Sequence, residues 1–504
     1  MKSSTKEIAE KLVEATKRFV DSALGRFTDR YGGTPLLMDG LNLDTGEPKK
    51  WEDHVLSNFA RQQNFLRTTQ ALGTITGDPS YRDWAVGTVR YGLSVLQDSA
   101  SKMLYWGGHS SWDLAEAKPL VGNHELKCVY PYYHLLHEVD PEATRLAVEG
   151  FWNRHVRDWS NLLFNRHGEY EDWDMAFPWE HEYDGGPTPI IDNDLLSFIN
   201  TGSDLIFAAS ILSKLEDDPE PLLWARRLAQ RYDDIRNPDT GLAGYQFNHR
   251  EPCRVRESFK RPLADREDVN ETTVITNGVI RTRYGKVALT LLNLYEELEG
   301  LAGREFLDIV ISDLTSLAEY SYDEGDHSFR PLLTSGESLE PKDCYEGVGY
   351  CSPRKLQKVP ADGLMFCAYA KAYRITGNDH FWEVIASISD GLGMRDPSEI
   401  ANSSERPQLS DPYLLFGLLE LYRATDERVF LSLATEIAHG MSKAGFSAGL
   451  LVPDKEGWTT IDSHLPLSLL SVAAAVRGQI GRLPVFYPGF GNFDPKVIIA
   501  LRRS

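Results

Sequence analysis

The sequence has few cysteines, no long apolar run and little strand-like alternation. Five cysteines stand among 504 residues, and no two of them have the C-x-x-C spacing. Neither a disulfide framework nor a zinc ribbon is therefore indicated, and a reducing compartment is favoured. No stretch approaches the ~18–20 apolar residues that cross a bilayer. The N-terminus lacks the apolar core of a signal peptide, which predicts a cytoplasmic protein without a membrane partner.

Basic residues are too few to balance the acidic ones. Lys and Arg number 53 against 74 Asp and Glu, which gives a formal net charge of −21. Such a surface repels nucleic acid, so we expect no nucleic-acid partner, and an anionic ligand would need a local basic pocket. Apolar residues make up 42% and charged residues 25%, which are ordinary values for a folded globular protein.

Helical periodicity dominates the chain, and one pattern that links two helices recurs along it. At its first occurrence Gly77 is suited to end a helix, Asp78 to cap the next one, and Tyr81 to pack the new helix back on the old. The same order returns at 373–381 and at 422–430. Looser copies lie at 136–142 and 215–220. Antiparallel helix hairpins are therefore predicted along most of the chain.

Repeated hairpins must either stack as an open solenoid or close into a ring. Long connections rich in Gly, Trp, Tyr and His alternate with the tight turns, at 101–124, 164–193, 237–278 and 322–360. This alternation favours closure. We predict an all-α fold, an (α/α) toroid, as a single domain over 1–504, with the long loops forming a cleft at one end. The polar segment 237–278 is predicted to be an excursion or a lid.

Histidine is sparse, with 13 residues, yet three histidines fall in loops or at helix starts within one short window. They are His109, His124 and His167, and Glu125 stands among them. Such a set can hold a divalent cation, and imidazole ligands favour a transition metal over calcium. The spacing leaves open which of His124 and Glu125 faces the ion, and solvated loop histidines are the alternative interpretation.

Several segments resemble those of the family 2 polysaccharide lyases, which cleave pectate and its oligosaccharides by β-elimination. The similar segments are Arg30–Leu37, Val55–Asn64, Tyr105–His109, His124–Lys127, Phe151–Asn153, Asn165–Gly168 and Asn237–Phe247. The resemblance implies an (α/α)₇ barrel and polygalacturonate as the substrate. It also implies His109, Glu125 and His167 as ligands of a divalent metal, manganese, nickel or cobalt rather than calcium, and Arg166 as the base that removes the C5 proton.

Arginine is an unusual base. It can accept a proton only where burial and a nearby cation disfavour its charged form. The assignment of Arg166 therefore leads us to expect an alkaline activity optimum, and a pH–rate profile with an acidic maximum would contradict it.

A polyanionic substrate also requires positive subsites. Arg281, Arg283 and Lys286 precede a helix, and Trp106 and Tyr350 could stack on sugar rings. We take these five residues as candidate substrate contacts. A second basic group follows later in the chain: Arg354, Lys355 and Lys358. A solvated basic patch and aromatic residues that fill the core are the alternative interpretations.

Two other functions fit parts of the pattern. Toroids also carry sugar epimerases and glycosidases, and inverting glycosidases use two carboxylates ~6.5–9.5 Å apart. Candidates for such a pair are Asp172, Asp174, Asp192, Asp194 and Asp362. A non-catalytic helical scaffold that binds glycans is the second alternative. A lyase differs from both because its unsaturated product absorbs ultraviolet light and forms without consuming water.

Overall fold

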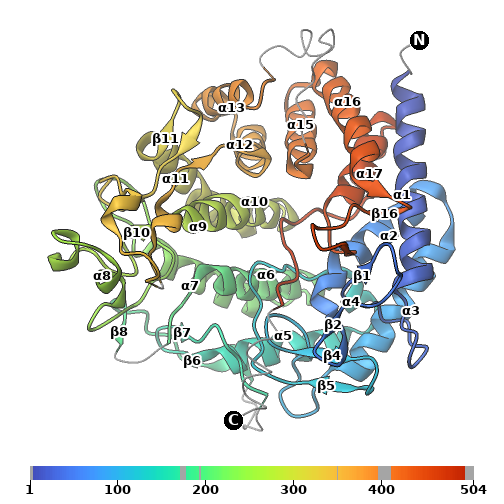
Figure 1. Cartoon of the computed structure of the whole chain (residues 1–504). Helices are drawn as coiled ribbons and strands as arrows, with labels where there is room; N and C mark the ends of the chain where they lie inside the picture. The colour runs from blue at the N-terminus through green and yellow to red at the C-terminus, as the bar shows by residue number, and fades with distance from the viewer. Residues whose placement is uncertain (1–3, 171–176, 192–194, 349, 395–409, 494–504) are drawn as a thin grey trace. The chain divides into compact units, whose positions relative to one another are not determined.

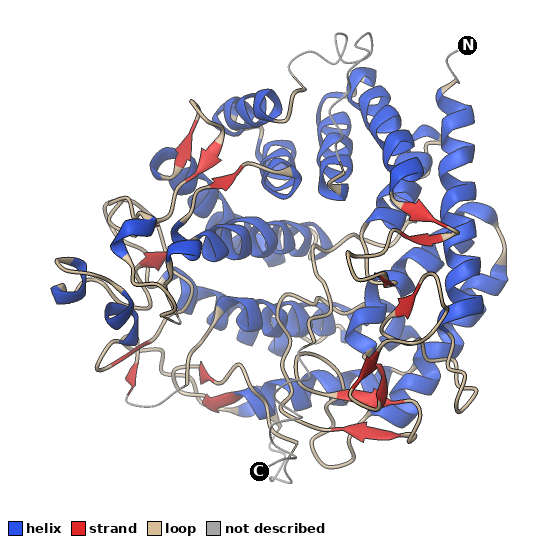
Figure 2. Cartoon of the chain, viewed as in Figure 1, coloured by secondary structure: helices blue, strands red, loops and turns tan. Residues whose placement is uncertain are grey.

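The computed structural model describes residues 4–170, 177–191, 195–348, 350–394 and 410–493, and helices dominate them (Figures 1 and 2). The helices are α1 (Thr5–Phe27), α2 (Gln63–Thr76), α3 (Pro79–Leu96), α4 (Tyr133–Val139), α5 (Pro141–His155), α6 (Ile199–Glu216), α7 (Pro219–Asp233), α8 (Arg254–Ser258), α9 (Asn277–Val279), α10 (Ala288–Glu297), α11 (Arg304–Tyr320), α12 (Gly363–Thr376), α13 (Asp379–Gly391), α15 (Pro412–Thr425), α16 (Arg428–Ala444) and α17 (Leu465–Val476). A π-helix, η4 (Ile280–Val287), joins α9 to α10. The all-α prediction is confirmed.

Strands in the described residues are short, two to four residues each, and form small sheets (Figure 2). The four-stranded sheet runs in the order β2 (Lys50–Trp51), β3 (His54–Ser57), β4 (Ser111–Asp113), β5 (Lys118–Leu120), with antiparallel neighbours. The other strands are β1 (Leu41–Asn42), β6 (Val156–Asp158), β7 (Leu163–Phe164), β8 (Ile190–Ile191), β9 (His249–Arg250), β10 (Val274–Ile275), β11 (Tyr322–Asp323), β12 (Ser328–Phe329), β13 (Leu332–Leu333), β14 (Val359–Pro360), β15 (Phe446–Ser447), β16 (Leu450–Leu451) and β17 (Trp458–Thr459).

The predicted helix hairpins are present, and their turns have the expected chemistry. Gly77 ends α2 with a left-handed backbone, φ 74°, and its N–H donates to the carbonyl of Gly73. The side chain of Asp78 accepts from the amide of Ser80 and caps α3. The copy between α12 and α13 repeats both features. There Phe381 packs on Tyr369 of the preceding helix, with ring centroids 5.9 Å apart.

The first and last helices of the described chain pack together. Helix α1 packs against α16 and α17, and α17 packs against α2, so the blue and the orange-red ends of the chain lie side by side in Figure 1. An open stack of hairpins keeps its two terminal repeats apart, because each repeat contacts only its neighbours. The meeting of the terminal helices is what the predicted ring closure requires.

The chain divides into two compact units that are interleaved in sequence. One consists of residues 1–154, 167–176 and 401–504, and the other of 155–166 and 177–400. One of the crossings between the units falls between Arg166 and His167, two of the predicted site residues. The prediction of a single domain stays a prediction.

The segment 237–278, predicted as an excursion, packs with the loop 322–360 on a small apolar core that these two connections share. Its members include Cys253, Val255 and Phe259 from the first connection and Cys344 and Cys351 from the second. The thiols are buried, and burial raises the pKa of Cys253 and Cys344 to about 11. Neutral buried thiols are inert, so these cysteines fill the core beneath the two loops.

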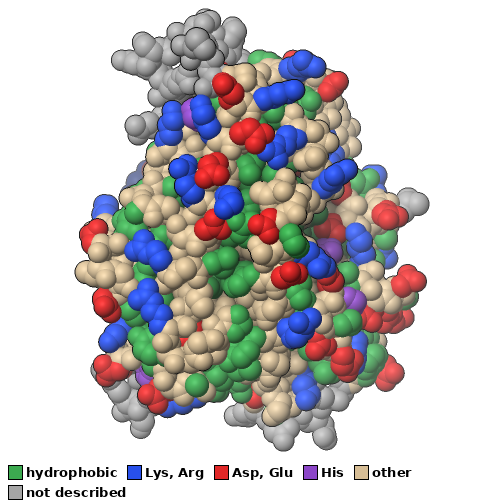
Figure 3. Space-filling model, turned by 90° about the vertical axis from the view of Figure 1, so that its right-hand side faces the viewer, with side chains coloured by type: hydrophobic (Ala, Val, Ile, Leu, Met, Phe, Trp, Pro, Cys, Tyr) green, Lys and Arg blue, Asp and Glu red, His purple; other side chains and the backbone are tan. Residues whose placement is uncertain are grey.

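No described helix combines the length and the apolar character that a bilayer span needs. On the face shown in Figure 3, the acidic and basic side chains drawn in colour are interspersed. The net negative charge is thus spread over this face rather than gathered into one patch.

Asp462 ties the C-terminal segment to α2 in the first unit. Its carboxylate accepts from the side-chain amide of Asn64 at 2.7 Å and from the amide of Gly491 at 2.8 Å. Burial raises its pKa to about 6, above the ~3.9 of an unfolded chain. The folded state therefore favours the protonated carboxyl, and stability is lost as the pH rises from about 4 through about 6.

Asp462→Asn should remove this pH dependence, because the amide carries no proton to lose. Relative to the native protein, the variant should gain roughly 2 kcal/mol in unfolding free energy between pH 4 and pH 7. Thermal unfolding of both proteins at these two pH values measures the difference. A stability difference that does not change with pH would contradict the assignment.

Candidate functional site

Short backbone pairings in the first unit join the three segments that carry the predicted metal ligands. Gly107 bridges Glu125 in parallel, and the amide of Gly108 donates to the carbonyl of Glu125 at 2.6 Å. His124 and Gly168 form an antiparallel bridge through two amide–carbonyl bonds of 2.8 and 2.9 Å. Glu125 belongs to one of these pairs, His109 directly follows Gly108, and His167 directly precedes Gly168.

The structure brings the side chains of His109, Glu125 and His167 together. One ligand atom from each lies within 4.8 Å of the other two. Nε2 of His109 is 3.1 Å from Oε2 of Glu125, and Nε2 of His167 is 3.6 Å from Oε1. The two imidazole rings are 5.2 Å apart between centroids and inclined at 73°. Glu125 is fully buried, and Lys127 Nζ lies 2.7 Å from its Oε2.

The two glycines before His109 allow its loop to approach Glu125 closely. A Cβ atom at Gly107 would lie 2.3 Å from the carbonyl oxygen of Glu125, and one at Gly108 would lie 2.6 Å from its Oε2. Neither distance is possible for a real side chain. Gly107 also has φ 90°, a region that other residues rarely adopt. A larger residue at Gly107 would displace the backbone of Glu125, and one at Gly108 would displace its carboxylate.

His124 is a buried structural residue in this site. Its Nε2 accepts a hydrogen bond of 2.9 Å from the indole N–H of Trp106. Burial lowers the pKa of His124 to about 3, so the ring stays neutral and can serve as this acceptor. Of the two residues between which the sequence left the choice open, it is Glu125 that lies against the two other ligand candidates.

The cluster could hold a transition metal. Two imidazole nitrogens and one carboxylate oxygen leave further coordination positions for water or a ligand, and imidazole suits transition metals better than calcium. A buried carboxylate also requires a nearby positive charge, because an isolated buried charge is strongly disfavoured. Lys127 supplies one such charge, and a divalent ion among the three side chains would supply another.

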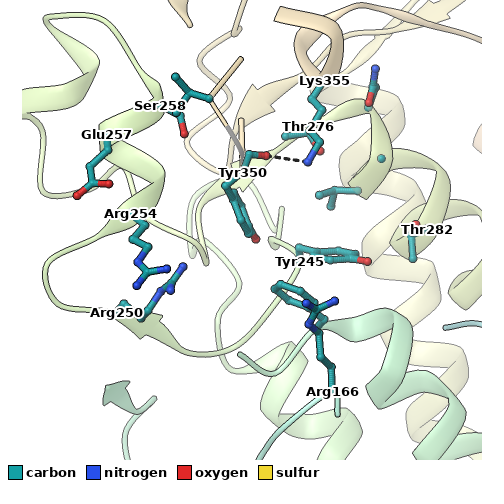
Figure 4. Close-up of a pocket in the computed structure, with 15 residues that line it drawn as sticks. Arg166, Tyr245, Arg250, Arg254, Glu257, Ser258, Thr276, Thr282, Tyr350 and Lys355 are labelled. Atoms are coloured by element: carbon teal, nitrogen blue, oxygen red, sulfur yellow. Dashed lines mark hydrogen bonds between the residues drawn. The ribbon is translucent and has the colours of Figure 1, made fainter. Parts of the chain in front are cut away.

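Arg166 lines a cavity of about 570 Å³ in the second unit (Figure 4). Its guanidinium lies over the ring of Phe198, 5.4 Å from the centroid. Tyr245, Tyr350 and Lys355 line the same cavity. This volume is within the ~300–1,000 Å³ of small-molecule sites.

Two arginines that the sequence interpretation missed also line this cavity. Arg250 and Arg254 lie beside each other in Figure 4, on β9 and at the start of α8. The buried carboxylate of Glu271 lies 3.6 Å from Nε of Arg250. The sequence feature that could have indicated them is a cluster of basic residues in 250–261, within the segment predicted to be an excursion or a lid. Such a cluster is unusual in an acidic protein.

The predicted substrate contacts have different locations. Tyr350 lines the cavity, and its hydroxyl donates to Gln246 at 3.0 Å. Arg281 is exposed and pairs with Asp362, and Lys286 is half-buried on η4. Neither of these two lines the cavity.

Arg283 and Trp106 are corrections to the predicted substrate-binding set. Arg283 is 0% exposed, and its guanidinium binds Asp313 at 3.1 Å and the carbonyls of Gly244 and Tyr232. Trp106 is buried against Phe59 and donates to His124. The charge of Arg283 and the ring of Trp106 are used in contacts inside the core, and a buried side chain has no exposed face that a sugar could contact.

The aspartates considered for a glycosidase pair give no such pair among the described residues. Asp362 caps α12, accepting from the amide of Met365, and pairs with Arg281. The others lie outside the described residues: Asp172, Asp174, Asp192 and Asp194.

Comparisons with known proteins agree with the sequence resemblance. Residues 34–495 match the sequence family described as periplasmic pectate lyase. A curated protein of Dickeya dadantii (strain 3937), named pectate disaccharide-lyase, is 30% identical over 484 residues, which cover 90% of this chain and 86% of that protein.

Solved structures similar to this chain include two cellobiose 2-epimerases. The enzyme of Spirochaeta thermophila DSM 6192 has 14% identity and a TM-score of 0.48, with 94% of this chain and 98% of that one covered. The enzyme of Bacillus thermoamylovorans B4167 has 10% identity and a TM-score of 0.46, with 92% and 100% covered.

Proposed function

Since this chain belongs to the periplasmic pectate lyase family and is therefore a polysaccharide lyase, we propose that it cleaves α-1,4-linked galacturonate with the help of a divalent transition metal. The observation that carries the metal requirement is the cluster of His109, Glu125 and His167, with ligand atoms within 4.8 Å of one another. Manganese, nickel and cobalt suit this donor set.

The three side chains would hold the ion, and each has a distinct role. Together they would hold an ion whose chemistry is that of a Lewis acid: it would offset the charge of the substrate carboxylate and of the intermediate formed when the C5 proton leaves. Glu125 offsets the charge of the ion and is itself kept in place by Lys127. His109 and His167 would each offer an imidazole nitrogen to the ion, from two different loops.

Arg166 is proposed as the base. In its neutral form the guanidine would take the C5 proton, and the C–H electron pair would form the C4–C5 double bond. The C4–oxygen bond would break with its electron pair on the leaving oxygen, which then takes a proton from solvent. We pair this residue with the cluster because it immediately precedes His167 in the chain. Arg166 and His167 are consecutive, so their Cα atoms are about 3.8 Å apart. Phe198 covers the guanidinium on one side, which limits its contact with water.

The cationic cavity around Arg166 is proposed to bind the uronate chain. Arg250, Arg254 and Lys355 are three cationic side chains in its lining, against one carboxylate, Glu257. Arginine binds carboxylates through paired N–H donors, which gives both affinity and orientation. Tyr245 and Phe198 add aromatic faces for the sugar rings.

Arg254→Ala should raise KM about 10–100-fold with a smaller change in kcat, because a charged hydrogen bond to the substrate contributes ~1.5–3 kcal/mol. Steady-state rates on oligogalacturonides measure both constants. Arg256→Ala is the matched control, since Arg256 lies on the same helix α8 but does not line the cavity. Equal KM values for Arg254→Ala and the native enzyme would remove Arg254 from the binding site.

The relative's name suggests the product. By analogy with the pectate disaccharide-lyase, we propose that this enzyme releases unsaturated disaccharides. Incubation with de-esterified oligogalacturonides and Mn²⁺ tests two claims: ultraviolet absorbance tests lyase activity, and sizing of the products tests disaccharide release. The absence of an unsaturated product would refute lyase activity, and a ladder of sizes would refute disaccharide release. The cytoplasmic location stays a prediction, which cell fractionation tests against the periplasmic location in the family's description.

A further inference from the structure

The side chain of Asn58 is bonded to both ends of the short loop that carries His109. Its Nδ2 donates to the carbonyl of Gly107 at 2.7 Å and to that of Ser110 at 3.1 Å. Its Oδ1 accepts from the amide of Gly107 at 3.0 Å. Asn58 is fully buried. One side chain thus fixes the residues on either side of Gly108 and His109.

Asn58 is itself held firmly. It caps the 3₁₀ helix Phe59–Gln62, where its Oδ1 also accepts from the amide of Ala60 at 3.2 Å. Its backbone amide donates to the buried carboxylate of Asp39 at 2.8 Å. Both side-chain donors and the side-chain acceptor are therefore used, which is the condition under which a buried amide stabilises one conformation.

The loop that Asn58 holds would otherwise have considerable freedom. Two consecutive glycines, Gly107 and Gly108, precede His109, and glycine loses more conformational freedom on ordering than any other residue. A ligand site that must be ordered at the moment of binding binds more weakly than one ordered beforehand. Gly108, between Gly107 and His109, donates its amide hydrogen bond to the carbonyl of Glu125. A shift of Gly107 would therefore disturb this bond and change the position of His109 relative to Glu125.

We propose that Asn58 is a positioning residue of the metal site, which sets His109 against Glu125 before an ion binds. This inference rests on the proposed role of His109, Glu125 and His167 as ligands. Asn58 does not touch the ion. It acts through the backbone of Gly107 and Ser110.

Asn58→Ala and Asn58→Asp test this role through the affinity for Mn²⁺, measured by calorimetry on protein freed of metal with a chelator. Both variants should bind Mn²⁺ about 10–100-fold more weakly, as is typical when a group that orients a ligand is removed. Aspartate should be no better than alanine, because it turns an acceptor toward the carbonyls of Gly107 and Ser110. At saturating Mn²⁺, Asn58→Ala should recover most of the native kcat, since all three ligands remain.

Gln62→Ala is the matched control. Gln62 is buried in the same 3₁₀ helix, and its amide donates to the carbonyl of Leu37 and the hydroxyl of Ser57, neither of which carries a metal ligand. This variant should bind Mn²⁺ like the native protein. Should Asn58→Ala fail to fold, Asn58→Ser keeps a capping oxygen and is measured instead.

The outcomes separate the inference from the proposed function. Native affinity in the folded Asn58 variants, or an equal loss in Gln62→Ala, would overturn the role of Asn58 while the metal site stands. If the native protein does not bind Mn²⁺, or if His109→Ala binds it as tightly as the native protein, the metal site itself is refuted.

Discussion

Replacing Arg166 by alanine is expected to lower kcat about 10²–10⁴-fold, which is the usual contribution of a general base. The affinity for Mn²⁺ should stay near the native value, because the proposed ligand atoms belong to His109, Glu125 and His167. Single-turnover rates at saturating oligogalacturonide isolate the chemical step from binding. Native turnover in this variant would defeat the assignment of Arg166 as the base.

Arg166→Lys separates a base from a simple positive charge. Lysine keeps a cation near this position but has a compact ammonium in place of the planar guanidinium. If Arg166 only attracted the uronate, lysine should restore most of kcat and leave a moderate change in KM. If Arg166 is instead a base whose guanidinium is held against Phe198, lysine should not restore proton removal, so that kcat remains low while KM is close to native.

Replacing Glu125 by alanine should abolish tight Mn²⁺ binding and reduce turnover by on the order of 10³-fold, because the proposed ion would contribute several kcal/mol of transition-state stabilisation. Glu125 is the central member of the cluster, within 3.1 Å of His109 and 3.6 Å of His167. Metal content after dialysis and the initial rate of double-bond formation measure the two effects.

Asp113→Ala is the control for Glu125→Ala. Asp113 is also a buried carboxylate of the first unit, and it pairs with a histidine, His54, at 2.5 Å. It contributes no atom to the cluster. If both variants lost Mn²⁺ equally, the loss would reflect general damage to the unit, and Glu125 would have no specific role as a ligand.

The helix hairpins were predictable because their turns depend on neighbouring residues. A left-handed Gly77 followed by a capping Asp78 defines the end of one helix and the start of the next, whatever lies elsewhere in the chain. The convergence of His109, Glu125 and His167 was anticipated from residue types and from the family resemblance. The backbone bridges that produce it link residues distant in sequence, and no local pattern reports them.

Side-chain roles that depend on burial could not be read from the sequence. Arg283 and Arg254 are both arginines, but Arg283 pairs with a buried aspartate while Arg254 lines the cavity. Trp106 precedes a glycine-rich loop, as a sugar-binding tryptophan could, yet its indole is committed to His124. Asn58 carries no chemical signature of a metal site, because its contribution lies entirely in hydrogen bonds to the loop backbone.

The most direct measurement of the central claim is the rate of double-bond formation from de-esterified oligogalacturonide by chelator-treated enzyme, followed as Mn²⁺ is added back. The cluster of His109, Glu125 and His167 predicts almost no rate without the ion and a saturable recovery to the full rate. An undiminished rate in excess chelator would contradict the claim that an ion held by these three side chains supports the elimination.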